Sequence, residues 1–139
     1  MQKAKTFLMF VGNKCGKAEE AIKLYTSLIP NSEIKKIDRW KEGEPMSIAG
    51  QVKTALFTLA GTEYLASENT GGHKFTFTPA ISIFIECEDE DEITRLHKEL
   101  SKNGKEFMPL DNYGFSKKFA WVEDRFGVSW QLNLADFIN

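Results

Sequence analysis

The chain has 139 residues, 42% of them hydrophobic and 12% aromatic, which is enough to bury one core and argues against intrinsic disorder. Its formal net charge of −2, without a dense run of basic residues, argues against a partner that is a nucleic acid or an anionic membrane surface. No apolar stretch reaches the roughly 20 residues that a membrane-spanning helix needs, so we expect no membrane partner and a cytoplasmic location.

The first half of the sequence predicts one strand, one helix and then three strands. The continuous apolar run Thr6–Val11 is typical of a strand that is buried on both faces. From Lys17 the apolar residues have helical spacing, and Pro30 ends this helix. Ala60 and Gly61 predict a tight hairpin. The three strands are expected at Ser32–Trp40, Gln51–Leu59 and Thr62–Ser67.

The second half repeats this order after a polar linker at residues 68–77. A strand is expected over Thr78–Cys87, and Asp89 and Glu92 have the spacing of a helix N-cap and its capping-box partner. Asn103 and Gly104 end that helix. Its apolar stripe is expected to contain Ile93, Leu96, His97 and Leu100. The remaining strands are expected at Lys105–Leu110, Lys117–Asp124 and Val128–Leu134.

The two halves can be aligned by counting residues, which indicates an internal duplication. Thr6 and Thr78 begin the expected first strands 72 positions apart, and the two expected helices have the same offset. The final hairpins match as Gly61–Leu65 with Gly127–Gln131. The alignment depends on the order of the elements, because few residues are identical.

The duplication predicts an α+β fold of two tandem βαβββ modules. One helix cannot cover the sheet of so small a module, so we expect the two modules to form a partly closed mixed sheet with the helices outside. The inner face of that sheet would be a cleft for a small molecule. We expect a single domain over residues 1–139, with the first module at about 5–67 and the second at about 78–135.

The last hairpin predicts which residues face the cleft. The segment Asp124–Val128 suits a three-residue loop with Gly127 in a left-handed conformation, which places Trp121 opposite Gln131. One face is then apolar and should pack under a helix, with Ala120, Val122, Val128, Trp130, Leu132 and Leu134. The other face is mixed and should line the cleft, with Phe119, Trp121, Glu123, Ser129, Gln131 and Asn133.

These features resemble a known family. The duplicated βαβββ plan is similar to the vicinal oxygen chelate superfamily, which includes glyoxalase I, extradiol dioxygenases, and bleomycin and fosfomycin resistance proteins. The segments Ala18–Leu28, Thr78–Ser82 and above all Asp124-Arg-Phe-Gly-Val-Ser-Trp-Gln131 resemble its PhnB-like branch, which is often labelled a 3-demethylubiquinone-9 3-methyltransferase domain. The resemblance covers nearly the whole chain and implies the glyoxalase-like fold.

The resemblance also implies where a metal would bind. Metal-dependent members take ligands from the first and last strands of each module, which correspond here to Thr6, Leu65, Thr78 and Gln131. Two hydroxyls, a leucine and an amide suit Zn²⁺, Fe²⁺ or Ni²⁺ poorly, because these ions prefer imidazole or carboxylate. We therefore expect no metal and no other cofactor.

We expect a ligand cleft instead of a metal site. Its expected lining is Thr6, Leu65, Thr78, Trp121, Ser129 and Gln131. Trp40 and His73 are candidates for its rim, and aromatic rings there could stack on a planar or cationic ligand or simply fill space. His73 could act as a general base, although the polar bias of loops favours a solvated side chain.

The remaining histidine and the two cysteines have simpler interpretations. His97 lies beside the helix stripe and is expected to be a half-buried structural residue. Cys15 precedes a helix, whose dipole could lower its pKa and make it a nucleophile, but a surface thiol is the simpler alternative. Cys87 is expected to pack as a small apolar residue, and we expect both thiols to be free.

Three classes of function remain open from the sequence. The first is a protein of the PhnB-like type that binds or sequesters a small molecule, as related resistance proteins do. The second is an enzyme, a lyase or transferase acting on an oxygenated metabolite with Gln131 in its site, and the third is an interaction module. Methyl transfer is disfavoured, because Gly12 and Gly16 lack the G-x-G-x-x-G spacing of a nucleotide-binding turn. The resemblance also implies a homodimer.

Overall fold

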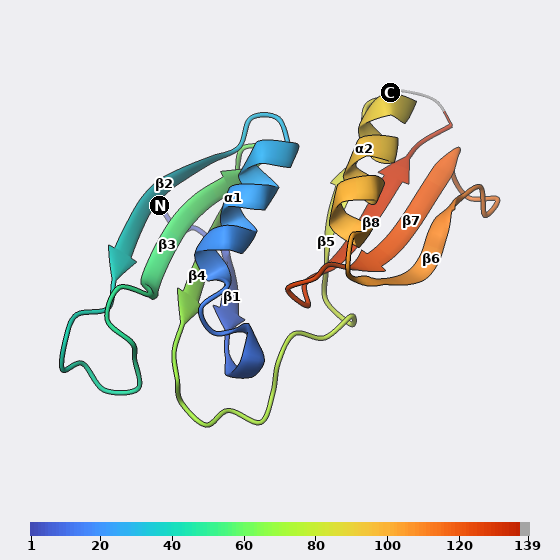
Figure 1. Ribbon diagram of the computed structural model, residues 1–139. Helices are drawn as coiled ribbons and strands as arrows, with labels where there is room; N and C mark the ends of the chain where they lie inside the picture. The colour runs from blue at the N-terminus through green and yellow to red at the C-terminus, as the bar shows by residue number, and fades with distance from the viewer. Residues whose placement is uncertain (137–139) are drawn as a thin grey trace. The chain divides into compact units, whose positions relative to one another are not determined.

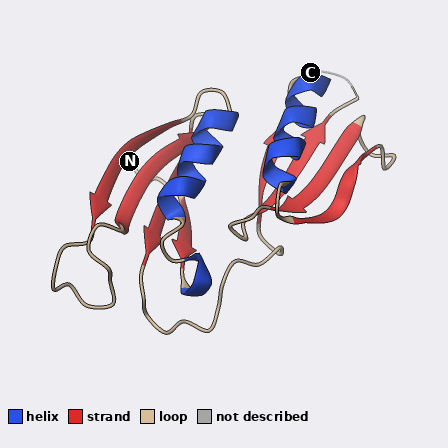
Figure 2. Ribbon diagram, in the orientation of Figure 1, coloured by secondary structure: helices blue, strands red, loops and turns tan. Residues whose placement is uncertain are grey.

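The structure is a computed structural model that describes residues 1–136 of the chain. It divides into two compact units, Met1–Thr76 and Phe77–Asn139. Each unit contains one four-stranded sheet with one α-helix on one of its faces, as Figures 1 and 2 show. No helix among the described residues is long and apolar enough to cross a membrane.

The first unit has the predicted order of strand, helix and three strands. Its sheet order is β1-β4-β3-β2, with β1 parallel to β4 and the other pairs antiparallel. A short 3-10 turn, η1 (Gly12–Lys14), lies between the first strand and the helix. The other elements are β1 (Thr6–Phe10), α1 (Ala18–Leu28), β2 (Glu33–Arg39), β3 (Val52–Leu59) and β4 (Thr62–Glu68).

The second unit repeats this topology. Its sheet order is β5-β8-β7-β6, again with one parallel pair, β5 and β8, and two antiparallel pairs. The elements are β5 (Ser82–Glu86), α2 (Glu90–Ser101), β6 (Lys105–Asp111), β7 (Lys118–Glu123) and β8 (Ser129–Leu134). The α+β glyoxalase-like fold with two modules is thereby confirmed.

Each helix buries an apolar stripe against its own sheet. The stripe of α1 is Ala18, Ala21, Ile22 and Tyr25, all fully buried, and that of α2 is Ile93, Leu96 and Leu100. Beneath α2 the strands contribute Ala120, Val122, Trp130 and Leu132, which are also fully buried. Each sheet therefore has one face covered by a helix and one face opposite it, which we call the open face.

The start of α2 confirms the predicted N-cap. The Glu92 backbone N–H donates to Asp89 Oδ1 at 2.8 Å, and the Glu92 carboxylate accepts from the backbone N–H of Glu88 at 3.2 Å. A standard capping box would satisfy the N–H of the cap residue itself, so here the reciprocal bond is shifted by one residue. The result still fixes where α2 begins relative to β5.

Two expectations for the first strands are wrong. Phe7 is 49% exposed, so β1 is not buried on both faces. The expected strand from Thr78 begins only at Ser82, because Thr78 lies in a turn where its Oγ1 accepts from the Ala80 N–H at 3.2 Å. The constant offset of 72 fails here because residues 11–17 connect β1 to α1, whereas residues 87–89 suffice between β5 and α2.

Candidate functional site

The predicted register of the last hairpin is confirmed. Trp121 pairs with Gln131 and Val122 pairs with Trp130. Gly127 has φ of 93°, and its N–H donates to the Asp124 carbonyl at 2.9 Å, as expected of a residue in the left-handed region after a tight loop. The mixed face predicted from the sequence is therefore the open face of the second sheet.

A buried carboxylate holds this hairpin in place. Asp124 is 2% exposed and accepts from the backbone N–H groups of Phe126 at 2.9 Å and Val128 at 3.0 Å. Its second oxygen accepts from Trp130 Nε1 at 2.9 Å. A buried carboxylate needs several hydrogen-bond donors around it. The motif Asp-Arg-Phe-Gly-Val-Ser-Trp supplies both the carboxylate, at its first residue, and the donors, within the next six. Asp124 thereby fixes β7 and β8, which carry the candidate site.

A chain of polar side chains crosses the open face. Trp121 Nε1 donates to Ser129 Oγ at 2.9 Å, and the hydroxyls of Ser129 and Ser82 are 2.7 Å apart. Gln131 Nε2 donates to Ser82 Oγ at 3.4 Å. These hydrogen bonds connect three predicted cleft residues, Trp121, Ser129 and Gln131, through Ser82, a residue of β5. They restrict the orientation of the Gln131 amide.

A pocket of about 480 Å³ opens beside these hydrogen-bonded side chains, within the second unit. Its lining is Phe84, Met108, Phe115, Phe119, Trp121, Gln131 and Asn133. The ring centroids of Phe115 and Phe119 are 5.0 Å apart in an edge-to-face arrangement, and Trp121 lies 4.9 Å from Phe107. None of the lining residues has an ionisable side chain. The pocket therefore offers aromatic walls and two amides, but neither an acid nor a base.

The remaining predicted cleft residues do not line the pocket of the second unit. Leu65 belongs to the first unit and pairs with Phe7. Thr6 lies on the same face of β1 as Leu8 and Phe10, because side chains two positions apart in a strand point the same way. Leu8 and Phe10 are buried on the helix-covered face. Thr78 lies in the exposed turn before β5. A single cleft formed by both units stays a prediction.

Several pocket residues were not identified as cleft residues from the sequence. Phe84 shares a strand face with Thr78 and Ser82 by alternation, so the strand expected from Thr78 already indicated that Phe84 lies on the predicted cleft face. Alternation from Ser82 would have placed Phe84 on the same face as Gln131, its partner in β8. Phe115 comes from the loop before β7, where no periodic pattern indicates its position.

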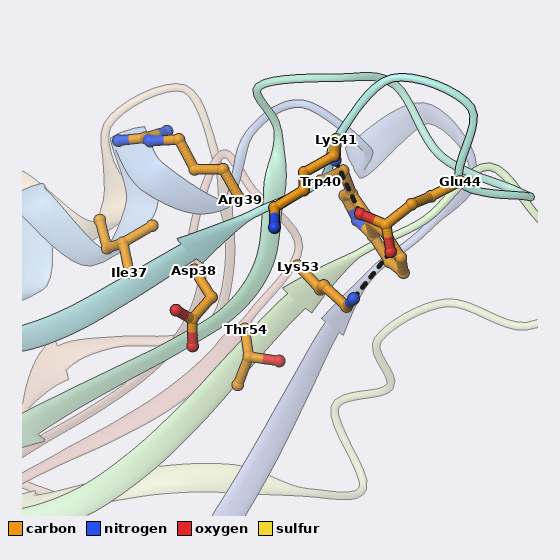
Figure 3. A pocket seen from close by; sticks show the side chains of 8 residues that line it. All are labelled: Ile37, Asp38, Arg39, Trp40, Lys41, Glu44, Lys53 and Thr54. Atoms are coloured by element: carbon orange, nitrogen blue, oxygen red, sulfur yellow. Dashed lines mark hydrogen bonds and ion pairs between the residues drawn. The ribbon is translucent and has the colours of Figure 1, made fainter.

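Trp40, the expected rim residue, lines a different hollow of about 690 Å³ in the first unit (Figure 3). Its Nε1 donates to the Glu68 carbonyl at 2.6 Å, and Lys53 Nζ lies 5.1 Å from the ring centroid. Lys53 is in turn bonded to Glu44 at 2.7 Å. Because the tryptophan N–H, its ring face and these two charges already have partners within the chain, the hollow is less suited to a ligand than the pocket of the second unit.

The two histidines have local partners. His73 is exposed, with Nε2 2.9 Å from Asn69 Oδ1 and its ring 4.8 Å from that of Phe75. His97 is half-buried and bonds to Glu106 of β6, which fits the expected structural role. Neither histidine lines the pocket of the second unit.

The environment of Cys15 does not support the hypothesis that it is a nucleophile. Burial and the nearby Glu68 raise the pKa of the Cys15 thiol, and its Sγ donates to Gln51 Oε1 at 3.2 Å. The hypothesis of a lowered pKa is therefore wrong, because α1 begins at Ala18 and the thiol instead lies near a carboxylate. Burial raises the pKa of Cys87 to about 12. Both thiols are free.

The positions implied for metal ligands carry poor donors. Thr6, Leu65, Thr78 and Gln131 offer two hydroxyls, a hydrocarbon side chain and one amide, which are weak ligands for a transition metal. The strand registers place Phe7 beside Leu65 and Phe84 beside Gln131, so the residues paired with the last strand of each unit add no donor atom. Across residues 1–136, His, Cys, Asp and Glu side chains form no group of three or more that could hold a metal ion. The residues present do not fit a bound metal.

Comparisons with known proteins place these observations in context. Residues 2–133 match a family described as 3-demethylubiquinone-9 3-methyltransferase. A PhnB protein from Bacillus cereus is 49% identical, with a TM-score of 0.89 over 96% of this chain and 100% of that one. A comparison with curated proteins gives no match.

More distant solved structures share the fold. Protein PA1353 from Pseudomonas aeruginosa is 22% identical with a TM-score of 0.82, over 97% of this chain and 98% of that one. A glyoxylase/bleomycin resistance protein/dioxygenase domain from Frankia sp. EAN1pec is 13% identical with a TM-score of 0.62, over 97% and 98% of the two chains. At these identities the similarity concerns architecture alone.

Proposed function

The chain belongs to the 3-demethylubiquinone-9 3-methyltransferase family, the PhnB-like branch of the vicinal oxygen chelate superfamily, and from this premise we propose that it binds a small molecule on the open face of its second sheet. The observation that carries the proposal is the pocket of about 480 Å³ between Phe84, Trp121 and Gln131. Small-molecule sites commonly have volumes of about 300–1,000 Å³, mostly apolar walls and a few oriented polar groups.

The polar groups of the pocket are held in position before any ligand arrives. Gln131 is tied through Ser82 and Ser129 to the indole of Trp121. A side chain whose orientation is already fixed loses less conformational entropy when it binds a ligand. This favours recognition of a defined molecule over adventitious contact with an apolar surface.

Binding without methyl transfer is the proposed activity, although the family's description names a methyltransferase. The segment from Gly12 to Gly16 begins with the 3-10 turn Gly12–Lys14 and lacks the glycine spacing of a nucleotide-binding loop. The pocket lining offers no nucleophile, acid or base that would begin a reaction. A lyase or transferase acting on an oxygenated metabolite would need such a group.

The proposal is tested by a ligand search with matched variants. We would screen a diverse fragment library against the full chain by two-dimensional NMR and examine the purified protein by native mass spectrometry for retained molecules. Hits should shift the Trp121 indole N–H and the Gln131 amide signals. Gln131→Ala should weaken their binding about tenfold, whereas Gln2→Ala, the same change at an exposed residue of the first unit, should not.

Two results would contradict the proposal. Fragments that bind elsewhere and leave the signals of Trp121 and Gln131 unchanged would remove the pocket from consideration. Turnover of a ketoaldehyde or thiol-conjugate substrate that disappears in Gln131→Ala would instead make this an enzyme site.

The proposed setting is a homodimer in the cytoplasm. Each sheet, taken by itself, has two outer strands, and unpaired strand edges are usually covered by another chain or element. Free Cys15 and Cys87 agree with a reducing compartment. Light scattering should give twice the chain mass, and a monomer at high protein concentration would contradict the dimer.

A further inference from the structure

We propose that the ligand of this pocket is an uncharged aromatic molecule whose hydroxyl group donates a hydrogen bond to Gln131 Oε1. This inference rests on the proposed function and specifies its ligand class. Three features of the pocket lead to it: the charge of its lining, the arrangement of its rings and the orientation of the Gln131 amide.

The lining excludes a charged ligand, because none of its residues could neutralise one. Carboxylates lie on the same face only at the margins: Glu86 pairs with Asn133, Asp111 with Phe119, and Glu123 with Ser129. Glu86 and Asp111 are exposed, so their charges remain in water. Charges in water act only weakly on a ligand of either sign, so an ion that enters the pocket would lose its hydration without an adjacent counter-charge.

The rings favour a planar ligand. Phe115 meets Phe119 at an interplanar angle of 71°, and Trp121 contributes a third wall to the pocket. Phe84 is 50% exposed and Phe115 is 61% exposed, so both have ring surface available for a contact. Aromatic surfaces gain most from another ring placed edge-to-face or in an offset stack.

The amide of Gln131 presents an acceptor. Its Nε2 is directed to Ser82 Oγ, and Ser82 is bonded to Ser129, which accepts from the Trp121 indole. Because an indole N–H can only donate, Ser129 accepts from Trp121, while either serine hydroxyl can donate to the other. Gln131 Oε1 has no partner among the described residues, so a ligand hydroxyl could complete its hydrogen bonding.

A set of four matched probes tests the inference on the full-length protein. The probes are 2-naphthol, 2-methoxynaphthalene, 2-naphthoate and 2-naphthylmethylammonium, titrated at pH 7 and followed by two-dimensional NMR. We expect 2-naphthol to bind tightest, about fivefold tighter than the methyl ether, which lacks the donor. We expect at least a tenfold advantage over the anion and over the cation.

Gln131→Leu should remove the advantage of 2-naphthol over the methyl ether while the ether still binds, because the ring contacts remain. Gln2→Leu, the same change at an exposed residue of the first unit, serves as the matched control and should keep the advantage. Equal or tighter binding of the cation, the anion or the ether to the natural sequence overturns the inference, even if Gln131→Leu does not fold. If library fragments bind the pocket and 2-naphthol does not, the inference fails and the proposed function stands. If neither binds there, both fail.

Discussion

The two modules have the same topology, yet their open faces differ in chemistry. In the first sheet, Phe7 lies beside Leu65, and in the second, Phe84 lies beside Gln131. Phe7 is 49% exposed and Phe84 is 50% exposed, so the two positions are equally accessible in the two sheets. The two faces differ in the residue beside each ring, because Gln131 hydrogen-bonds through Ser82 to Ser129, whereas Leu65 has an apolar side chain. The two units therefore share one backbone topology, but the second has a polar side chain, Gln131, where the first has Leu65.

The modules also use their buried carboxylates differently. Glu68 in the first accepts from the backbone N–H groups of Ala18 at 3.1 Å and Val52 at 2.7 Å, and so connects α1 to β3. Asp124 in the second stabilises the β7–β8 hairpin from within. Both are 2% exposed. The first carboxylate therefore joins elements far apart in sequence, and the second fixes a local turn beneath the candidate site.

The largest effect is expected from Asp124→Ala. The substitution leaves two buried backbone N–H groups and the Trp130 indole without their acceptor, so the second unit should lose about 3 kcal/mol of unfolding free energy. Urea unfolding followed by tryptophan fluorescence would measure it. Asp124→Asn keeps one carbonyl oxygen and should lose less. Equal losses in both variants would mean that the hydrogen bonds of Asp124 do not hold the hairpin.

A smaller loss, about 2 kcal/mol, is expected from Gly104→Ala. Asn31 and Asn103, each just after a helix, share φ of 57°, but Ser32 follows the first and Gly104 the second. A Cβ on Gly104 would lie 2.0 Å from the Glu123 carbonyl oxygen, so the backbone must move. Gly72→Ala is the control, since a Cβ there would meet no atom within 4 Å. Similar melting temperatures for Gly104→Ala and the natural protein would contradict this close approach.

Glu68→Gln should cost about 1–2 kcal/mol, because an amide keeps one acceptor oxygen but sets an N–H beside a buried donor. Hydrogen exchange at Ala18 and Val52 should accelerate in this variant. Glu42→Gln, a change at an exposed loop residue, should leave exchange unaltered. If Glu68→Gln accelerates exchange throughout the second unit instead, the division of labour between the two carboxylates is wrong.

The smallest effect concerns acid. The guanidinium of Arg39, which donates to both Glu19 oxygens, lowers the pKa of that carboxyl from 4.5 to about 2. Its stabilisation is therefore present above pH 4.5 and lost as the pH falls toward 2. Since the pair is largely solvated, we expect about 0.5–1 kcal/mol. Glu19→Gln should flatten that part of the pH–stability curve, and an unchanged acid slope would show that the pair contributes nothing.

Some of the candidate site could be predicted because its determinants are local. Gly127 and the alternation around Trp121 gave the correct hairpin register, since turn chemistry and a two-residue period are properties of adjacent residues. The error at Thr78 has an equally local origin. Pro79 marks the turn, because proline has no N–H for a strand ladder, and the strand begins only after it, at Ser82.

The sequence by itself determined the βαβββ order, the apolar stripes of both helices and the mixed face that contains Gln131, because each follows from periodic patterns within one segment. The tertiary structure alone decided that β5 pairs with β8, which sets Ser82 beside Ser129 and Phe84 beside Gln131, and that Phe115 lines the same pocket. Parallel pairing of β5 with β8 joins residues far apart in the chain, and the position of a loop side chain depends on packing, so neither leaves a periodic signal.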